Sequence, residues 1–328
     1  MNEVPAIQLL MKTTALAREL WQGHAPNINN AKKLALFEAA GGRERVPEGE
    51  LRIARYMAGA LMDAAPAHDV AVESVVSVYT YAAPPAGTRA WHVNFADPYL
   101  FAFYGTAAFA QDEIQVAEHP LLASVRELLL AGEAPGWTPR TVDEHGITPV
   151  LVRDVERWSA IDLSPQRAHP DGIYGRKLQK ASDDVLREAV TRLPPGGPRS
   201  NILAIAAPTG AGFYTEEQVR TVLEAASAGF FAARLESDPK ERVVIHTGHW
   251  GTGAFGGNRE LMAIGQIFAA RLARIDTLVY HSLDERAAAS LAAGRAFVRE
   301  RLDGVNTTRA AIDAIMERRF AWGSSDGN

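Results

Sequence analysis

A glycine-rich segment between an apolar run and a helical pattern constrains the fold of this chain most. Five glycines fall among residues 248–257, directly after the apolar run 243–245, and a helical pattern starts at residue 259. Glycine lets the backbone adopt left-handed conformations and approach a ligand closely, so several N–H groups can converge on an anion at a helix N-terminus. The segment predicts a strand, a phosphate-binding loop and a helix with Asn258 as its N-cap; a tight connection without a ligand is the alternative.

Two aromatic residues, Trp250 and Phe255, lie within this loop. A small polar loop rarely contains aromatic side chains unless one anchors it in the core or stacks on a ligand. The loop lacks the Gly-Lys-Ser/Thr of a Walker motif, and it lies in the last third of the chain rather than in a first βαβ unit. These two classes of nucleotide-binding loop therefore explain the sequence less well.

The order Gly-x-Trp-Gly-x-Gly-Ala-Phe-Gly-Gly over residues 248–257 resembles the diphosphate-binding loop of the poly(ADP-ribose) glycohydrolase family of macrodomains. The resemblance implies that the loop binds the pyrophosphate of ADP-ribose and that Phe255 packs against a ribose. It assigns ligand contacts in this loop to Gly248, Trp250, Gly251, Thr252, Gly253, Ala254, Phe255, Gly256 and Gly257.

A second motif lies upstream, where Asp97 ends a β-rich run and Gln111, Asp112 and Glu113 follow. On a helix, neighbouring carboxylates point about 100° apart, so they can serve different groups of one ligand; a solvated acidic helix turn is the alternative. The family has a Val-Asp-Phe-Ala-Asn strand, a triple-glycine loop and Gln-Glu-Glu in this order. By resemblance, Asp97 and Asp112 bind the distal ribose and Gln111 belongs to the binding site. Glu113 is the catalytic carboxylate, and Asp112 is counted with it as a catalytic residue.

Cleavage of a glycosidic bond requires a positioned carboxyl group, because the reaction passes through an oxocarbenium-like state. An acid must protonate the leaving group and then activate water. Glu113 is the candidate for this role, and a diphosphate fixed in the glycine-rich loop would orient the reacting carbon.

The chain departs from the family pattern in the second motif. Phe101 and Phe103 fall on the triple glycine, and Asp97 replaces the asparagine. Phenylalanine fills the space that glycine leaves open for a ligand, so both phenylalanines are expected at the ligand and a polymer is expected to fit poorly. Further along, Phe213 or Tyr214 either stacks on the adenine or anchors the core.

The spacing of apolar residues divides the chain into three parts. Helical periodicity over 6–22 and 50–63 predicts an N-terminal helical extension, residues 1–71. Strand and helix patterns then alternate, which predicts a three-layer α/β macrodomain, a mixed sheet flanked by helices, over 72–321. Residues 322–328 are expected to be a flexible tail.

Composition limits the partners. The net charge of −5 argues against broad electrostatic binding to nucleic acid, which is expected as a partner only if ADP-ribosylated. The chain has no cysteine, and His246 and His249, the only close histidine pair, lack a third ligand, so neither a metal nor a cofactor is expected.

No basic leader and no run of 18 apolar residues is found, so we expect a cytoplasmic protein without a membrane partner. The oligomeric state is left open.

Two functions follow from the resemblance. The first is a divergent hydrolase of an ADP-ribose glycosidic bond, acting on an ADP-ribosyl group or a small NAD-derived substrate. The second is a non-catalytic macrodomain that binds ADP-ribose or an NAD derivative. Retention of Glu113 favours the enzyme, whereas Phe101 and Phe103 favour the binding module. The expected ligand in both cases is ADP-ribose or a related diphosphate nucleotide.

Overall fold

A computed structural model of the chain describes residues 7–61, 68–133, 136–144, 146–165, 167 and 169–325. Its centre is an eight-stranded sheet with the order β1-β2-β7-β10-β4-β11-β12-β3. The strands are β1 (Ile7–Leu16), β2 (Glu50–Ala58), β3 (Ala71–Val76), β4 (Thr88–Ala96), β7 (Val150–Glu156), β10 (Arg199–Ala206), β11 (Arg242–Gly248) and β12 (Thr277–Ser282). Two small sheets pair β5 (Val142–Asp143) with β6 (Gly146–Ile147), and β8 (Ser159–Ile161) with β9 (Val190–Arg192).

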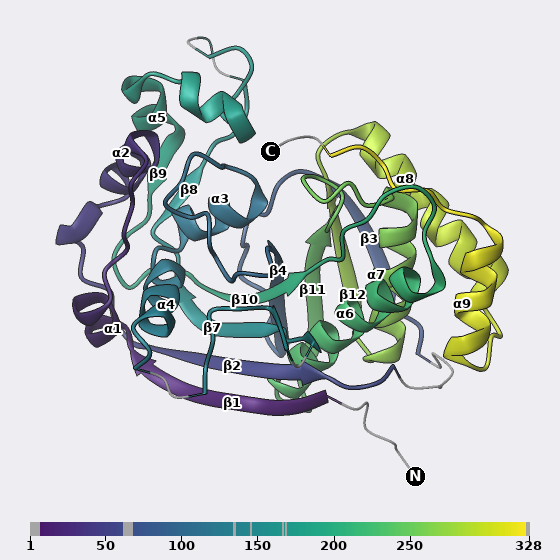
Figure 1. Cartoon of the computed structure of the whole chain (residues 1–328). Coiled ribbons are helices and arrows are strands. Elements are labelled where there is room, and N and C mark those ends of the chain that lie inside the picture. The colour runs from purple at the N-terminus through teal and green to yellow at the C-terminus, as the bar shows by residue number, and fades with distance from the viewer. Residues whose placement is uncertain are drawn as a thin grey trace.

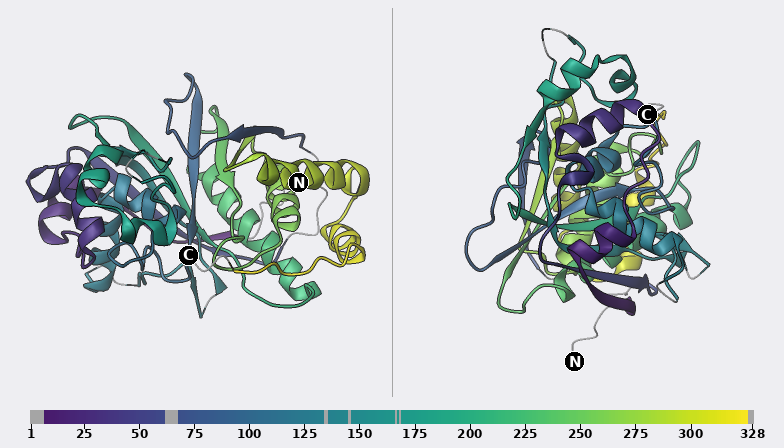
Figure 2. Two further views of the ribbon diagram at one scale, coloured as in Figure 1. Left: turned by 90° about the horizontal axis from the view of Figure 1, so that it is seen from above. Right: turned by 90° about the vertical axis from the view of Figure 1, so that its left-hand side faces the viewer.

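The large sheet is mixed. The strands β10, β4, β11, β12 and β3 run parallel to one another, whereas β1, β2, β7 and β10 pair in antiparallel fashion. Helices lie on both sides of it (Figures 1 and 2). One group is α1 (Ala17–Gly23), α2 (Ala31–Ala39), α3 (Gln111–Glu118), α4 (Leu121–Leu130) and α5 (Asp183–Ala189); the other is α6 (Glu216–Leu235), α7 (Arg259–Leu272), α8 (Glu285–Phe297) and α9 (Thr308–Glu317). The predicted α/β class, a mixed sheet flanked by helices, is confirmed.

The predicted N-terminal helical extension is wrong in most of its length. Residues 7–16 form β1 and residues 50–58 form β2, and only 17–23 is helical within the first predicted range. Because β2 lies between two other strands, apolar residues occupy both of its faces and their spacing does not alternate strictly. The remaining residues of the two predicted helices, 6, 62 and 63, lie outside the described part of the chain.

The first two strands belong to the large sheet. β1 pairs with β2 from Ile7 opposite Ala58 to Leu16 opposite Glu50, and β2 continues onto β7. The predicted division after residue 71 therefore does not correspond to a break in the sheet.

The predicted tail also starts too early. The ring of Trp322 stacks on Tyr214 with centroids 4.1 Å apart and an interplanar angle of 11°. Its Nε1 donates a 3.2 Å hydrogen bond to Gln218, and the N–H of Gly323 donates to the carbonyl of Gly256 at 2.7 Å. Trp322 and Gly323 are thus packed against the domain, while 326–328 lie outside the described residues.

The parallel strands determine where a site can form. β4, β10 and β11 end at the same edge of the sheet, so the segments that follow them meet there. These are residues 97–110, 207–215 and 249–258. Among the described residues, no helix is long and apolar enough to span a membrane.

Candidate functional site

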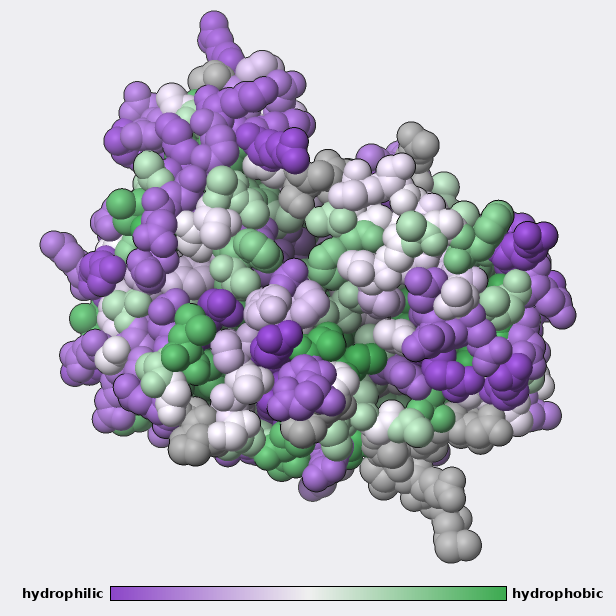
Figure 3. All heavy atoms as spheres, viewed as in Figure 1, coloured by the Kyte–Doolittle hydropathy of each residue, from purple (hydrophilic) through white to green (hydrophobic). Residues whose placement is uncertain are grey.

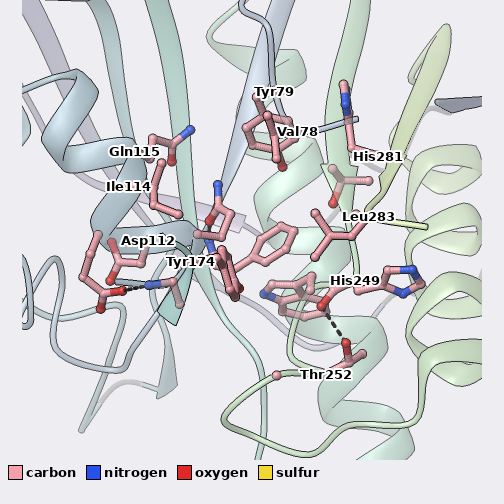
Figure 4. Close-up of a pocket in the computed structure, with 18 of the residues that line it drawn as sticks. Val78, Tyr79, Asp112, Ile114, Gln115, Tyr174, His249, Thr252, His281 and Leu283 are labelled. Carbon is pink, nitrogen blue, oxygen red and sulfur yellow. Dashed lines mark hydrogen bonds between the residues drawn. The ribbon is translucent and has the colours of Figure 1, made fainter. Parts of the chain in front are cut away.

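A cavity of about 500 Å³ opens at this edge of the sheet. Figure 3 shows a hollow in this face of the molecule, between the part that contains α3 and the part that contains α7 and α8. Figure 4 shows Asp112 and Gln115 on one side of the cavity and His249, Thr252 and Leu283 on the other. The predicted site residues that line it are Asp97, Phe103, Gln111, Asp112, Glu113, Gly248, Trp250, Gly251, Thr252, Gly253, Ala254 and Phe255.

The glycine-rich loop is fixed to the core at both ends. Its N-terminal half is anchored by Trp250, which is buried and donates a 2.9 Å hydrogen bond from Nε1 to the carbonyl of Ile205. Its C-terminal end is capped by Asn258, whose Oδ1 accepts from the N–H groups of Glu260 and Leu261 at 3.1 Å each. The predicted N-cap is confirmed, and Trp250 anchors the loop while Phe255, half-buried, lines the cavity.

Close packing explains why glycine is needed at residue 251. Gly251 has φ +72°, and a Cβ there would lie 2.4 Å from Cβ of Ala207 and 2.6 Å from Cε of Met262. A larger residue would push the loop away from the strand end. The loop can follow this path only because position 251 has no side chain.

The loop leaves several backbone donors without a protein acceptor. Internal hydrogen bonds use the N–H groups of residues 250, 252, 256 and 257. Within the described part of the chain, no acceptor is found for the N–H groups of Gly251, Gly253, Ala254 and Phe255. These donors precede the N-terminus of α7, and such an arrangement favours an anion such as a diphosphate.

The second motif starts α3 and is tied to β4. Gln111 accepts a 2.8 Å hydrogen bond from the N–H of Phe95 through Oε1, and its Nε2 donates to the carbonyl of Val93 at 3.1 Å. Asp112 is buried and accepts a 2.9 Å hydrogen bond from Nδ2 of Asn94. The bonds of Gln111 and Asp112 hold the start of the helix at the edge of the sheet.

Glu113 is also buried, and its two carboxylate oxygens have different surroundings. Its Oε2 accepts a 2.7 Å hydrogen bond from the N–H of Ala110, the N-cap of α3. Its Oε1 accepts no hydrogen bond from the described residues, and the side chain lines the cavity. One oxygen therefore fixes the carboxylate while the other is accessible to a ligand.

The buried carboxyl group of Asp112 has a raised pKa. Burial raises the pKa of Asp112 to about 8; the charge of Glu113 raises it further, and the hydrogen bond from Asn94 and the charge of Lys33 oppose the rise. Asp112 therefore carries a proton at neutral pH. A protonated carboxyl group can donate a hydrogen bond to a ligand in the cavity.

Lys33 on α2 is a residue of this region that the sequence reasoning missed. It is only 3% exposed, and its Nζ donates 2.9 Å hydrogen bonds to the carbonyls of both Phe103 and Tyr104. Burial lowers its pKa to about 8, while the charges of Glu113 and Asp112 raise it. A lysine at helical spacing from the buried Leu36 and Phe37 is the signal that could have revealed it.

Phe101 and Phe103, the two phenylalanines expected at the ligand, differ in their surroundings. Phe101 is fully buried in the core below the site and does not line the cavity, so its prediction as a ligand contact is wrong. Its φ of +52° lies in the left-handed region that favours glycine. Phe103 is 42% exposed and lines the cavity beside Asp97, whose Oδ1 accepts a 2.9 Å hydrogen bond from the N–H of Tyr99.

Four further predicted contacts lie outside the cavity. Phe213 is 60% exposed and packs under Arg319, and Tyr214 is buried with its hydroxyl accepting a 2.9 Å hydrogen bond from the N–H of Asn258. The core-anchoring alternative is thus correct for Tyr214. Gly256 and Gly257 are buried and do not line the cavity; the N–H of Gly257 donates to the carbonyl of Gly251 at 2.9 Å. Three tyrosines that the sequence reasoning did not select, Tyr79, Tyr81 and Tyr174, do line the cavity.

The histidine pair considered in the sequence is separated in the structure. His246 Nδ1 lies 3.1 Å from His281 Nε2, whereas His249 Nδ1 lies 3.2 Å from the hydroxyl of Tyr280. Burial lowers the pKa of both His246 and His249 to about 4, so both are neutral at pH 7. In the described ranges, no group of three or more histidine and carboxylate side chains is arranged to hold a metal ion.

Comparison with known proteins gives a family match over part of the chain. Residues 176–290 match the family model described as "Poly (ADP-ribose) glycohydrolase (PARG), Macro domain fold". None of the curated proteins matches the sequence. The matched segment contains β10, α6, β11, the glycine-rich loop, α7 and β12.

Solved structures of bacterial poly(ADP-ribose) glycohydrolases are similar to the chain at low identity. The enzyme from Thermomonospora curvata is 17% identical, with 87% of this chain and 85% of that chain covered and a TM-score of 0.45. The enzyme from Deinococcus radiodurans in complex with ADP-ribose is 12% identical, with 88% and 94% covered and a TM-score of 0.46. At such low sequence identity, the function of a residue in those enzymes cannot be assigned to a residue of this chain. The family match covers residues 176–290, and over this segment the chain is similar to poly(ADP-ribose) glycohydrolases of the macrodomain fold.

Proposed function

We propose that this protein hydrolyses a glycosidic bond of an ADP-ribose derivative, either an ADP-ribosyl group or a small NAD-derived nucleotide. One observation carries the proposal: a single cavity contains both the unpaired N–H groups of the glycine-rich loop and the carboxyl groups of Asp112 and Glu113. The loop offers a diphosphate its preferred partners. The carboxyl groups offer proton transfer at a sugar carbon held nearby.

Glu113 is the acid and base of the proposed reaction. The C1–O bond of the distal ribose breaks as a carboxyl proton passes to the leaving oxygen, and water then forms the new bond to C1 while losing its proton to the carboxylate. Oε1 is the atom that can act, because Oε2 is held by the N–H of Ala110. Asp112 and Asp97 are proposed to bind the hydroxyl groups of that ribose.

A non-catalytic binding module is the second candidate. It is favoured by the bond between Glu113 and Ala110, which gives the carboxylate a role in capping α3 that needs no catalysis. Phe103 in the cavity favours it too, because its ring reduces the space beside the carboxyl groups. In this case ADP-ribose would bind and no substrate would be cleaved.

Side-by-side binding and turnover measurements separate the two candidates. The wild type and Glu113→Gln are titrated with ADP-ribose by calorimetry and assayed on mono-ADP-ribosylated peptides, poly(ADP-ribose) and NAD. Glu113→Gln is expected to bind normally and to lose roughly 10²-fold or more in turnover, since the amide keeps the shape but cannot transfer the proton. Glu217→Gln, an exposed residue in the first turn of α6, is the matched control. Binding without turnover by the wild type would establish the binding module.

A further inference from the structure

Lys33 on α2 is far away in sequence from Asp112 and Glu113, and it contacts the segment that precedes them. Lys33 is held at its helix N-terminus by Asn30, whose Oδ1 accepts a hydrogen bond from the N–H of Lys33 at 3.2 Å. The Nζ group donates to the carbonyls of Phe103 and Tyr104, at 2.9 Å each. These carbonyls belong to the segment that takes the place of the family's glycine loop. Lys33 therefore fixes the backbone that precedes α3.

The surroundings of the ammonium group explain why it is tolerated when buried. A buried charge is costly unless acceptors or opposite charges surround it. Two carbonyl acceptors satisfy part of its hydrogen-bonding capacity, and the face of Phe109 lies 6.0 Å away. The acidic groups that act on it are Glu113 and Asp112 on α3, and neither forms a direct ion pair with it among the described contacts. The remaining acidic group that acts on the carboxylate pair is Asp97.

Lys33 is coupled electrostatically to the start of α3. It supplies one positive charge to this buried group, and the charges of Glu113 and Asp112 raise its pKa. The charge of Lys33 in turn lowers the pKa of Asp112. Removing that charge is therefore expected to raise the pKa of Asp112.

We propose that Lys33 is a positioning residue of the site: its two hydrogen bonds hold the segment at Phe103 and Tyr104 in place, and it supplies a buried positive charge to the start of α3. The proposal deepens the proposed hydrolase function and rests on it for its catalytic consequence. Lys33 does not line the large cavity, so it acts on substrate only through the groups it holds.

Two substitutions separate the charge from the hydrogen bonds. Lys33→Gln retains a donor for the carbonyls but has no charge, whereas Lys33→Met has neither. Lys32→Gln is the matched control, because Lys32 is the adjacent lysine of the same helix and its partner is Asp183, at 2.8 Å and away from the cavity. Each variant is assayed for kcat/KM against pH, for ADP-ribose affinity, and for the titration of Asp112 by ¹³C NMR of labelled aspartate.

The expected results differ between the variants. In Lys33→Gln the midpoint of the pH profile and that of the Asp112 titration both move upward by about one pH unit or more, while ADP-ribose affinity stays within about twofold of the wild type. Lys33→Met shows the same shifts and a lower melting temperature, and Lys32→Gln matches the wild type. A Lys33→Gln variant with the pH profile and Asp112 titration of the wild type would overturn the proposal and reduce Lys33 to a structural anchor.

A reciprocal measurement leaves Lys33 in place and does not depend on the folding of its variants. The titration of Lys33 is followed by NMR of ¹³Cε-labelled lysine in the wild type and in Glu113→Gln. Because the charge of Glu113 raises the pKa of Lys33, the pKa is expected to fall in Glu113→Gln. An unchanged value would refute the electrostatic coupling. If the wild type cleaves no substrate, the hydrolase proposal fails, and the two NMR titrations still decide the role of Lys33.

Discussion

The indole nitrogen of Trp250 donates a 2.9 Å hydrogen bond to the backbone carbonyl of Ile205, so the glycine-rich loop is joined to the end of the neighbouring strand β10. The bond is buried, so its loss is expected to cost stability. The loop is thus a rigid part of the domain rather than a free connection.

Trp250→Phe is expected to lower the free energy of unfolding by about 1–3 kcal/mol and to weaken ADP-ribose binding, because a buried acceptor loses its donor. Trp158→Phe is the control: Trp158 is also fully buried, but its Nε1 has no hydrogen-bond partner in the described structure. Denaturant unfolding and calorimetry are the measurements. Equal affinity losses in the two variants would show that the bond to Ile205 does not position the loop.

Gly251→Ala is expected to destabilise the protein and to weaken ADP-ribose binding, because the added Cβ meets Ala207 and Met262. Gly212→Ala separates this clash from backbone strain: Gly212 has the same φ of +72°, but open space surrounds its Cβ position. The control should lose only about 1 kcal/mol. If thermal unfolding and nucleotide titration give the same values for both variants, close packing at Gly251 has no special importance.

Asp112 predicts a pH dependence of stability. Its pKa is about 8 in the folded state and near 3.8 when unfolded, so between these values the folded state binds more protons. This contribution to stability is fully present below pH 3.8 and is lost as the pH rises to 8. Asp112→Asn should remove this fall, and its melting temperature should exceed that of the wild type at pH 7–8. Parallel curves of melting temperature against pH for both proteins would contradict the prediction.

Phe103 is expected to restrict the substrates of the proposed hydrolase. Its half-exposed ring lines the cavity, so a continuing ADP-ribose chain should fit poorly while a mono-linked group fits. Phe103→Gly should raise the activity on polymer relative to mono-linked substrates. Phe101→Gly, in contrast, should lower stability without a change in preference, because Phe101 lies in the core; the packing loss of about 3–5 kcal/mol is offset in part since glycine suits its φ of +52°. Efficient degradation of polymer by the wild type would refute the restriction.

Local patterns predicted the loop and the start of α3 well. The glycines, the cap at Asn258 and the acidic pair at Asp112 and Glu113 depend on residues close in sequence, and the structure brings the loop and the pair into one cavity. Local patterns failed where residues far away in sequence determine the structure of a segment. β2 is a strand because β1 and β7 pair with it, and Tyr214 points to the core because Trp322 covers it. The contact of Lys33 with the segment at Phe103 and Tyr104 could not be predicted, because no local signal indicates which loop a helix will contact.

The contacts of Lys33 and Trp322 have a consequence for how the site is assembled. Lys33 supports the segment before α3 from one end of the chain, and the contacts of Trp322 and Gly323 support the segments at Tyr214 and Gly256 from the other. During synthesis, the cavity cannot reach its final form until residue 323 has left the ribosome. A fragment limited to residues 72–321 would contain every motif of the site and lack both supports.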